Sequence, residues 1–381
     1  MFNFYEFFAG GGMARMGLGP DWRCLFANDF DHKKSRVYRE NWGDDSLVTA
    51  DIRSIKASGL PDQSDLAWAS FPCQDLSLAG GGAGLKGDRS GMFWPFWELM
   101  HALGKEGRAP RIIAIENVCG TLTSHGGKDF AAICTSFEKS GYRCGAVIID
   151  AALFVPQSRP RLFIIAVRND VDVPPGLIGH DPSPLWHTNA LGKAYGELPP
   201  PTKKNWIWWA MPAPQMRNTC FEDIIEERPS DVHWHSIDET QQLVAMMSAA
   251  NIAKLEKAKV VNGRVVGTIY KRTRPDENGR KVQRAEVRFD NIAGCLRTPG
   301  GGSSRQLIMV IKGNSVKSRL ISSRETARLM GLPDEYELPA NYNEAYHLTG
   351  DGVVVPVVRH LAEHIFEPIL LHRSSHLRSA A

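Results

Sequence analysis

The sequence has few of the features that place a protein in a membrane, in a secretion pathway or around a metal ion. Its 381 residues contain no apolar run near the roughly 18 residues that a membrane span needs, and no basic leader precedes an apolar stretch. The seven cysteines are odd in number and include no Cys-x-x-Cys pair, so neither a disulfide framework nor a zinc cage is indicated. We expect free thiols, no metal and a cytoplasmic location.

A large net charge is also lacking. Lys and Arg number 45 and Asp and Glu 42, which leaves a formal net charge of +3. The positive charge is nevertheless concentrated, because residues 254–288 carry 11 basic and 4 acidic side chains. A local block of one sign, rather than the sum over the chain, indicates where a polyanion binds.

The first 170 residues alternate short β-rich runs with segments of helical periodicity, which is typical of a parallel sheet covered by helices. The predicted strands are 3–8, 24–28, 66–70, 111–115, 146–150 and 162–167, and the predicted helices include 92–103, 128–140, 322–330 and 353–366. This pattern predicts a doubly wound α/β domain. Nine of the 23 prolines fall in residues 171–214 and indicate a linker there.

A glycine-rich turn follows the first predicted strand. Residues 8–12 read Phe-Ala-Gly-Gly-Gly, where the backbone can turn tightly and a ligand can approach it. The dinucleotide pattern Gly-x-Gly-x-x-Gly is not met, because position 15 is Arg15, so a simple turn remains an alternative. Asp29 and Phe30 end the next strand, where a carboxylate can accept hydrogen bonds from ribose hydroxyls and an aromatic ring can stack on adenine. Asp51 offers another acceptor at the same edge.

A thiol, an acid and two arginines follow or precede other predicted strands. Cys73 stands in the sequence Phe-Pro-Cys-Gln, before a loop with six glycines between residues 80 and 91. Its thiolate could be a nucleophile, although a buried apolar cysteine is the commoner situation. Glu116 offers a carboxyl group that could donate a proton, and Arg159 and Arg161 could bind phosphate or a substrate oxygen. Together they indicate an active site at one sheet edge.

With these motifs in order, the chain resembles the DNA (cytosine-5) methyltransferases of the bacterial restriction-modification type. The matching segments are residues 8–12, 28–31, 51–52, 72–74, 116–118, 157–161, 324–331 and 345–353. The resemblance implies a Rossmann-like catalytic domain that binds S-adenosylmethionine, formed by residues 1–185 and completed by 341–381. It also implies a second, smaller target-recognition domain in residues 186–340.

The resemblance implies roles for individual residues. Cys73 would add to C6 of a cytosine flipped out of duplex DNA, Glu116 would assist at N3, Arg161 would hold the base carbonyl and Arg159 would support the site. The implied cofactor contacts are Phe8, Ala9, Gly10, Gly12, Asp29, Phe30, Asp51, Ile52, Pro72, Phe93 and Asp351. The expected DNA contacts are Gln74, Ser77, Arg89, Lys271, Arg272, Arg274, Arg284 and Arg305. Asp29-Phe30 departs from the commoner Glu-Trp, and Gly-Asp-Gly at 350–352 from Gly-Asn-Ser.

We therefore expect a monomeric, site-specific DNA (cytosine-5) methyltransferase that acts on double-stranded DNA in the nucleoid, in a restriction-modification or phage and host-protection context and alongside a restriction endonuclease. A transfer-RNA cytosine-5 methyltransferase and a non-catalytic DNA-binding relative remain alternatives. The basic stretch argues against the first, and the intact Cys73, Glu116 and Arg161 argue against the second. Residues 271–284 could also be a solvated charged hairpin, and Trp206, Trp208 and Trp209 are expected to pack in the interior.

Overall fold

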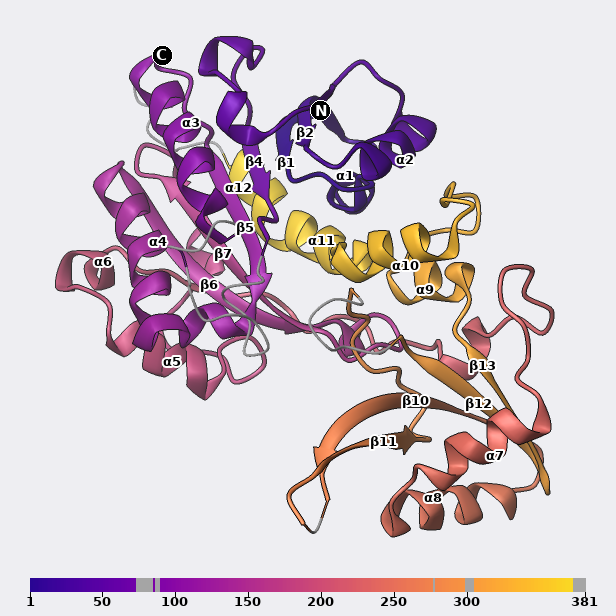
Figure 1. Cartoon of the computed structure of the whole chain (residues 1–381). Coiled ribbons are helices and arrows are strands. Elements are labelled where there is room, and N and C mark those ends of the chain that lie inside the picture. Colours follow the sequence, from indigo (N-terminus) through magenta and orange to yellow (C-terminus); the bar gives the residue numbers. More distant parts are fainter. Residues whose placement is uncertain (73–84, 86–89, 277, 299–304, 373–381) are drawn as a thin grey trace. The chain divides into compact units, whose positions relative to one another are not determined.

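A computed structural model describes residues 1–72, 85, 90–276, 278–298 and 305–372. The chain forms two compact units (Figure 1). The first unit comprises Met1–Asp150, Pro160–Gln215 and Val353–Ala381, and the second comprises Ala151–Arg159 and Met216–Gly352. Within the described ranges, no helix combines the length and the apolarity that a membrane span requires.

A seven-stranded sheet forms the centre of the first unit. Its strands are β1 (Phe2–Phe7), β2 (Trp22–Asp29), β3 (Leu47–Thr49), β4 (Leu66–Ala69), β5 (Ile112–Val118), β6 (Tyr142–Asp150) and β7 (Pro160–Arg168). They lie in the order β3-β2-β1-β4-β5-β7-β6, and β7 alone runs antiparallel to its neighbours. The predicted α/β fold is confirmed, but the sheet is mixed. The physical reason is the short connection of nine residues between β6 and β7, which is too short for a parallel crossover.

Helices cover both faces of this sheet. They include α1 (Met13–Leu18), α2 (His32–Trp42), α3 (Phe93–Lys105) and α4 (Lys128–Lys139). Phe7 packs on one face against Phe96 of α3, with ring centroids 5.2 Å apart. The winding direction reverses between β1 and β4, because β2 and β3 lie on one side of β1 and β5 on the far side of β4. Ligands of such sheets bind at the carboxyl ends of the strands at this switch point.

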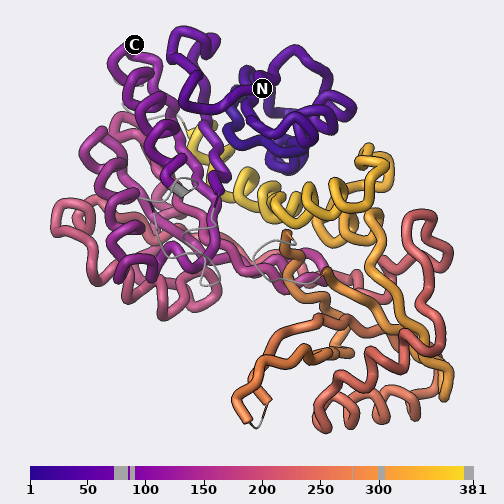
Figure 2. Tube along the Cα trace, viewed as in Figure 1, coloured from indigo at the N-terminus to yellow at the C-terminus, as the bar shows by residue number. Residues whose placement is uncertain are grey.

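The C-terminal helices return to the N-terminal part of the first unit (Figure 2). Helix α11 (Val355–Leu361) continues through a π-helical turn at residues 362–366 into α12 (Glu367–Leu371), close to the predicted helix 353–366. Gly17 of α1 lies against α11 so closely that a Cβ would come within 2.5 Å of Val358 Cβ and 2.6 Å of the Val355 carbonyl oxygen. The absence of a side chain at Gly17 therefore permits the contact between the two helices.

The proline-rich stretch also packs on the first unit. It contains β8 (Ile178–Gly179), α5 (Asn189–Gly196), α6 (Pro200–Lys204) and β9 (Trp208–Trp209). Trp209 is fully buried and Trp206 and Trp208 pack against the core, as expected for these three residues, and Trp186 is fully buried as well. Residues 186–215 thus belong to the first unit and not, as expected, to the second. Burial of these indole rings against the sheet outweighs the proline content as a boundary signal.

An antiparallel four-stranded sheet organises the second unit. Its strands β10 (Arg264–Pro275), β11 (Lys281–Arg288), β12 (Leu307–Lys312) and β13 (Ser315–Leu320) lie in the order β11-β10-β12-β13. Helices α7 (Ile237–Ala245) and α8 (Ala249–Lys259) bury Leu243 and Leu255 against Ile269, Ala285 and Met309 of the sheet. This unit also contains α9 (Ser323–Leu329), which confirms the predicted helix 322–330, and α10 (Tyr342–Asp351), which was expected to complete the first domain.

A fully buried ion pair connects β13 to α9. Arg319 and Glu325 both have side chains with 0% exposure, and the two guanidinium nitrogens donate to the two carboxylate oxygens at 2.8 and 2.6 Å. Glu325 also accepts from the backbone N–H of Ser322, so it caps the start of α9. The Arg319 guanidinium lies 4.9 Å from the Trp234 ring. These contacts compensate the desolvation of both charges.

We predict that Gly17→Ala destabilises the protein. The added methyl group must displace α11 or the backbone of α1, which costs about 1–3 kcal/mol in a packed interior. Gly104, in the exposed last turn of α3, is the matched control, because a Cβ there meets nothing within 4 Å. Gly104→Ala is expected to leave stability unchanged or to raise it by up to about 1 kcal/mol. Urea unfolding measures both, and equal destabilisation by the two variants would contradict the prediction.

Candidate active site

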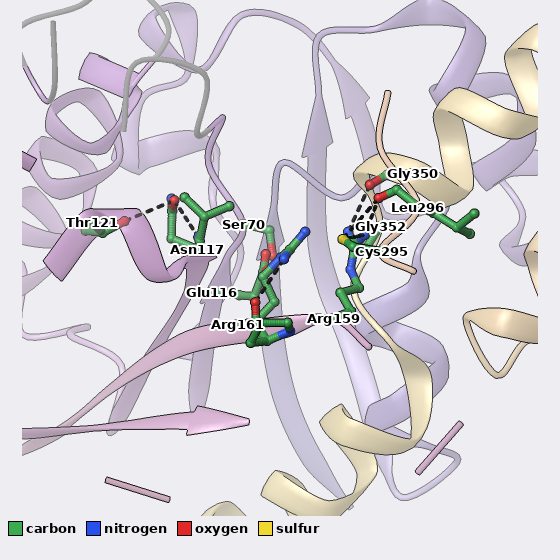
Figure 3. Close-up of polar contacts among 12 residues, drawn as sticks. Ser70, Glu116, Asn117, Thr121, Arg159, Arg161, Cys295, Leu296, Gly350 and Gly352 are labelled. Carbon is green, nitrogen blue, oxygen red and sulfur yellow. Dashed lines mark hydrogen bonds and ion pairs between the residues drawn. The ribbon is translucent and has the colours of Figure 1, made fainter. Parts of the chain in front are cut away.

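Glu116 and Arg161 form an ion pair at the carboxyl end of β5 (Figure 3). The Arg161 Nε lies 3.2 Å from Glu116 Oε1, and the two side chains are only 16% and 9% exposed. Antiparallel pairing of β5 with β7 aligns Val118 with Arg161 and Glu116 with Phe163, so Glu116 and Arg161 are diagonal neighbours on one face. The structure therefore brings together two of the predicted catalytic residues.

The neighbouring strand β4 ends beside β5 and leads towards the Pro-Cys motif. Ala69 of β4 pairs with Ile115 of β5, so Ser70 and Glu116 are the next residues along the two strands. Asn117 donates from Nδ2 to the carbonyl oxygen of Phe71 at 3.2 Å. Its Oδ1 accepts from the Val118 N–H at 2.9 Å and from the Thr121 hydroxyl at 3.3 Å, which fixes the orientation of the amide. Asn117 thus anchors the backbone immediately before Pro72.

The glycine-rich turn after β1 is held by Asp29. The Gly10 N–H donates to Asp29 Oδ2 at 2.8 Å, and the Asp31 N–H donates to Oδ1 at 2.8 Å. Phe8, Gly10 and Gly12 have φ values of 57°, 56° and 78°, in the left-handed region that favours glycine. Burial raises the pKa of Asp29 against the opposing effects of Lys34 and the two N–H groups. The carboxylate predicted for a ribose therefore also shapes the turn.

The remaining cofactor candidates of the first unit differ in their surroundings. Phe30 is 65% exposed directly after β2, so its ring is available for stacking. Asp51 caps a short helical turn and pairs with Arg53, whose terminal nitrogen lies 2.5 Å from Oδ2. Ile52 and Phe93 are buried in the core, and Ala9, also buried, donates its N–H to the Asn28 carbonyl oxygen. Pro72 is partly buried.

The exposed Phe30 ring, the glycine turn and the Asp29 carboxylate fit the chemistry of a nucleoside. A Cβ at Gly10 would meet no atom of the described residues within 4 Å, so among these residues open space lies beside the turn. At Gly12, by contrast, a Cβ would lie 2.3 Å from Trp42 Nε1. A glycine is therefore required at position 12 so that the turn can pack against α2. The turn therefore combines a packed side with an open one, as a backbone that closely approaches a ligand requires.

Arg159 lies in the second unit and binds backbone carbonyl groups (Figure 3). Its NH1 donates to the Leu296 oxygen at 2.8 Å, and its NH2 donates to the Gly350 and Gly352 oxygens at 2.9 and 2.7 Å. Its exposure is 2%. In the same unit, Asp351 accepts a hydrogen bond from the Thr298 hydroxyl. These contacts give Arg159 a structural role in joining residues 295–296 to the end of α10.

An ionisable side chain, Glu6, is buried in β1, the strand that leads into the glycine turn. Its Oε1 accepts from the Arg15 N–H at 3.3 Å, and its Oε2 has no hydrogen-bond partner in the part of the chain that the structure describes. Burial raises its pKa to about 8, with Arg15 opposing and Asp29 adding to the shift. Arg15 itself donates to the Tyr38 hydroxyl at 3.0 Å, and its guanidinium lies 4.7 Å from the Trp42 ring centroid.

The basic residues expected to contact DNA lie mainly on the β10–β11 ribbon. Pairing places Lys271 opposite Ala285, Arg272 opposite Arg284 and Arg274 opposite Val282. The alternation of strands therefore puts Arg272, Arg274 and Arg284 on one face and Lys271 on the other. Arg305 lies before β12, where it donates to Asn343 Oδ1 and contacts the Tyr342 ring at 5.9 Å.

Four predicted residues, Cys73, Gln74, Ser77 and Arg89, lie outside the described residues. The six described cysteines form no disulfide with one another, and burial raises the pKa of the Cys24 thiol to about 11 and that of Cys119 above its usual range. Neither thiol is therefore activated as a nucleophile. In the described ranges no group of three potential metal ligands occurs. The rings of His360 and His364 meet edge to face with centroids 4.4 Å apart, but the described ranges offer no third ligand beside them.

Two residues of this site were missed from the sequence alone. Asn117 stands within the Glu116-Asn117-Val118 motif, but its bond to the Phe71 carbonyl depends on the pairing of strands 46 residues apart in sequence. Glu6 had a detectable signal, because it is the one acidic residue of β1, a strand whose other residues are aromatic except for Asn3. Its unusual protonation depends on burial, which the sequence of a single strand does not reveal.

The chain matches the family described as C-5 cytosine-specific DNA methylase over residues 2–367. Type II methyltransferase M.NlaX from Neisseria lactamica is 25% identical over 367 residues, which cover 95% of this chain and 96% of the relative. Type II methyltransferase M.HhaI from Haemophilus parahaemolyticus is 24% identical over 369 residues, which cover 95% and 94%. The similarity therefore extends over nearly the whole length of both relatives.

Solved structures share the fold. A mutant of DNMT2 from Spodoptera frugiperda aligns with a TM-score of 0.60 and 16% identity, covering 96% of this chain and 100% of that one. Dnmt2 from S. pombe aligns with a TM-score of 0.57 and 16% identity, covering 97% of this chain and 99% of that one. At this level of identity the likeness concerns the arrangement of helices and strands.

We predict that the hydrogen bonds of Asn117 stabilise the first unit. Asn117→Ala leaves the buried Phe71 carbonyl without its donor, at a cost of about 1–3 kcal/mol, and Asn117→Asp is worse because it sets a carboxylate against that oxygen. Thr121→Val should cost about 1 kcal/mol through the loss of the hydroxyl that orients the amide. Thr123→Val is the matched control, since Thr123 is exposed. If urea unfolding shows that Thr123→Val and Thr121→Val destabilise the protein equally, the stabilising role of the Asn117 hydrogen bonds is contradicted.

Glu6 should make stability fall with rising pH. Because its pKa is about 8 when folded and about 4.5 when unfolded, the folded state holds a proton between these values that the unfolded state has released. The contribution of Glu6 to the free energy of unfolding thus declines from pH 4.5 to pH 8 and stays constant above pH 8. Glu6→Gln removes the titration. The free energy of unfolding of the variant should therefore rise relative to that of the parent by a few kcal/mol between pH 4.5 and pH 8. A pH-independent difference in urea midpoint would contradict the prediction.

Proposed function

Since the chain belongs to the C-5 cytosine-specific DNA methylase family, we propose that it is a site-specific DNA (cytosine-5) methyltransferase that uses S-adenosylmethionine. The observation that carries this proposal is the Glu116–Arg161 ion pair at the carboxyl edge of the sheet, beside the strand that leads into the Pro72-Cys73 motif. An acid and a guanidinium held together at this edge can bind the polar side of a pyrimidine while a thiolate attacks its ring.

The glycine turn, Asp29 and Phe30 would hold the cofactor. The turn would approach it with its backbone, Asp29 would accept from the ribose and the exposed Phe30 ring would stack on the adenine. S-adenosylmethionine, when bound, would supply a methyl group on a sulfonium that a carbon nucleophile can take, and S-adenosylhomocysteine would leave as the product. Asp51 and Asp351 are further candidates for cofactor contacts, although Arg53 pairs with the first and the Thr298 hydroxyl donates to the second.

The Cys73 thiolate would add to C6 of the cytosine. A bond forms between sulfur and C6, and the ring electrons shift so that C5 becomes nucleophilic. Glu116 would donate a hydrogen bond or proton at N3, which accepts the charge displaced by the thiolate. After methylation at C5, a base removes the C5 proton, the C5–C6 double bond re-forms and the bond to Cys73 breaks, which restores the thiolate.

The two arginines would have different tasks. Arg161 would hold the carbonyl oxygen of the base, and its ion pair with Glu116 keeps both side chains oriented before the base enters. Arg159 would support the site indirectly, because its guanidinium donates to the carbonyl oxygens of Leu296, Gly350 and Gly352. The base must leave the duplex to reach these groups, at a cost of a few kcal/mol.

We assign target recognition to the second unit and, within it, to the basic β10–β11 ribbon. Its arginines can bind phosphates and the guanine edges of the major groove. We further propose that the protein acts as a cytoplasmic monomer in a restriction-modification or protective context. The similarity to Type II methyltransferases over most of their length supports this context.

Methyl transfer from labelled S-adenosylmethionine to mixed-sequence duplex DNA tests the proposal. We expect 5-methylcytosine with the parent protein and a loss of at least about a thousandfold with Cys73→Ala, because no other group supplies the nucleophile. Glu116→Gln and Arg161→Ala should lower the rate while retaining cofactor binding. Duplex DNA that carries 5-fluorocytosine should trap the parent protein covalently.

Two controls separate the alternatives. Faster transfer to transfer RNA than to duplex DNA would favour an RNA methyltransferase, and DNA binding without any covalent adduct would indicate a non-catalytic relative. Unchanged activity in Cys73→Ala would overturn the proposed mechanism. Cys24→Ala controls for the loss of a thiol elsewhere, because burial raises the pKa of Cys24 to about 11 and it lies outside the proposed site.

A further inference from the structure

One carboxylate on the β10–β11 ribbon binds two arginines at once. Glu286 Oε2 lies 3.2 Å from Arg272 Nε, and Glu286 Oε1 lies 2.7 Å from Arg274 Nε. Arg272 and Arg274 are two residues apart on β10, and Glu286 of β11 pairs with Tyr270, so all of these side chains share one face of the ribbon. Each carboxylate oxygen therefore serves one guanidinium.

Glu286 contacts both guanidinium groups through Nε and not through their terminal nitrogens. Both ion pairs are made through Nε, and the terminal nitrogens of Arg272 and Arg274 make no other hydrogen bond within the described ranges. A guanidinium has five N–H donors in a rigid plane, four of them on the two terminal nitrogens. The terminal edge therefore remains available for a second bidentate partner, and the arginine side chains are 43% and 50% exposed.

The position of Arg272 is further restrained by Tyr270. The Arg272 guanidinium lies 5.7 Å from the centre of the Tyr270 ring. Tyr270 is itself held, because its hydroxyl donates to the Cys295 carbonyl oxygen at 2.7 Å. An arginine bound by a carboxylate at Nε and by an anchored ring has fewer conformations than a free surface arginine, so less entropy is lost when it binds.

The ribbon face keeps an excess of positive charge despite Glu286. One carboxylate faces Arg272 and Arg274, and Arg284 lies directly opposite Arg272 without an ion-pair partner in the described part of the chain. Like charges directly across two strands are unfavourable for the sheet. A charge arrangement that disfavours the isolated ribbon is consistent with a surface that binds a polyanion.

We propose that Glu286 is a positioning residue for sequence recognition: it orients Arg272 and Arg274 so that their terminal N–H groups bind O6 and N7 of guanine in duplex DNA. This inference rests on the proposed function. Guanine offers two acceptors in the major groove that match the paired donors of an arginine. Without Glu286, the same arginines would turn to the nearest phosphates, which carry no sequence information.

The test begins with the target of the parent protein. Bisulfite sequencing of a randomised duplex library after methylation identifies the recognition sequence, and a parent that methylates no DNA would contradict the proposed function itself. Glu286→Gln is then compared with Glu256→Gln, a matched control that removes the same charge from α8, where Glu256 pairs with Lys259. Helix α8 packs on the opposite face of the sheet.

Glu286→Gln should lower discrimination between cognate and non-cognate duplexes by about tenfold or more, the value of a good bidentate contact. Its binding to non-cognate DNA should be unchanged or tighter, with a steeper dependence on salt, because two arginines become free to bind phosphates. Glu256→Gln should match the parent in discrimination. Binding of S-adenosylmethionine should be equal in all three proteins, which checks the first unit, and equal midpoints of urea unfolding check the second unit, which contains both substitutions.

Two results would overturn the inference. Unchanged discrimination in Glu286→Gln would mean that the arginines need no orientation, and an equal loss of binding to cognate and non-cognate DNA would mean that Glu286 only stabilises the ribbon. If Glu286→Gln does not fold, the double substitution Arg272→Lys with Arg274→Lys tests the guanine contacts that the inference requires, and unchanged discrimination in it would overturn the inference. It keeps the charge but removes the paired donors, so discrimination should fall while salt-dependent binding remains.

Discussion

The antiparallel pairing of β7 with β5 is the constraint on which the site depends. It aligns Val118 with Arg161, which brings the guanidinium to Glu116 from a strand 45 residues further along the chain. A shift of one residue in this register would turn every side chain of β7 to the other face of the sheet and separate the pair. The apolar residues from Leu162 to Val167, all buried, oppose such a shift. Packing of the strand interior thus determines the geometry at its polar end.

Several polar residues near the site bind backbone groups and not only prospective ligands. Asp29 accepts from two N–H groups around the glycine turn, Asn117 donates to the Phe71 carbonyl, and Arg159 donates to three carbonyl groups. A buried backbone group without a partner is costly, so each contact stabilises a loop whose position matters for chemistry. In the first unit, Asp29 and Asn117 therefore hold loops at the same carboxyl edge as the Glu116–Arg161 pair that we propose as catalytic.

The second unit contains a buried ion pair and a set of surface ion pairs that differ in how their charges are satisfied. Arg319 and Glu325 are completely buried and paired in a bidentate manner, and Trp234 and the backbone around α9 complete their environment. On the β10–β11 ribbon, by contrast, one carboxylate serves two arginines and leaves their terminal edges exposed to solvent. The first arrangement satisfies both ions within the protein, whereas the second leaves two half-exposed arginines that share one carboxylate.

The sequence by itself determined the α/β character, the approximate strands and helices, the order of the motifs and hence the family. These features are local, because periodicity and turn residues act within a few residues. Tertiary structure alone decided the partners: Glu116 with Arg161, Asn117 with Phe71 and Arg159 with the end of α10. It also decided that residues 186–215 pack on the first unit, since burial of Trp186 and Trp209 depends on a surface made elsewhere in the chain. Periodicity reveals which face a side chain occupies, but only strand register and packing reveal what it meets there.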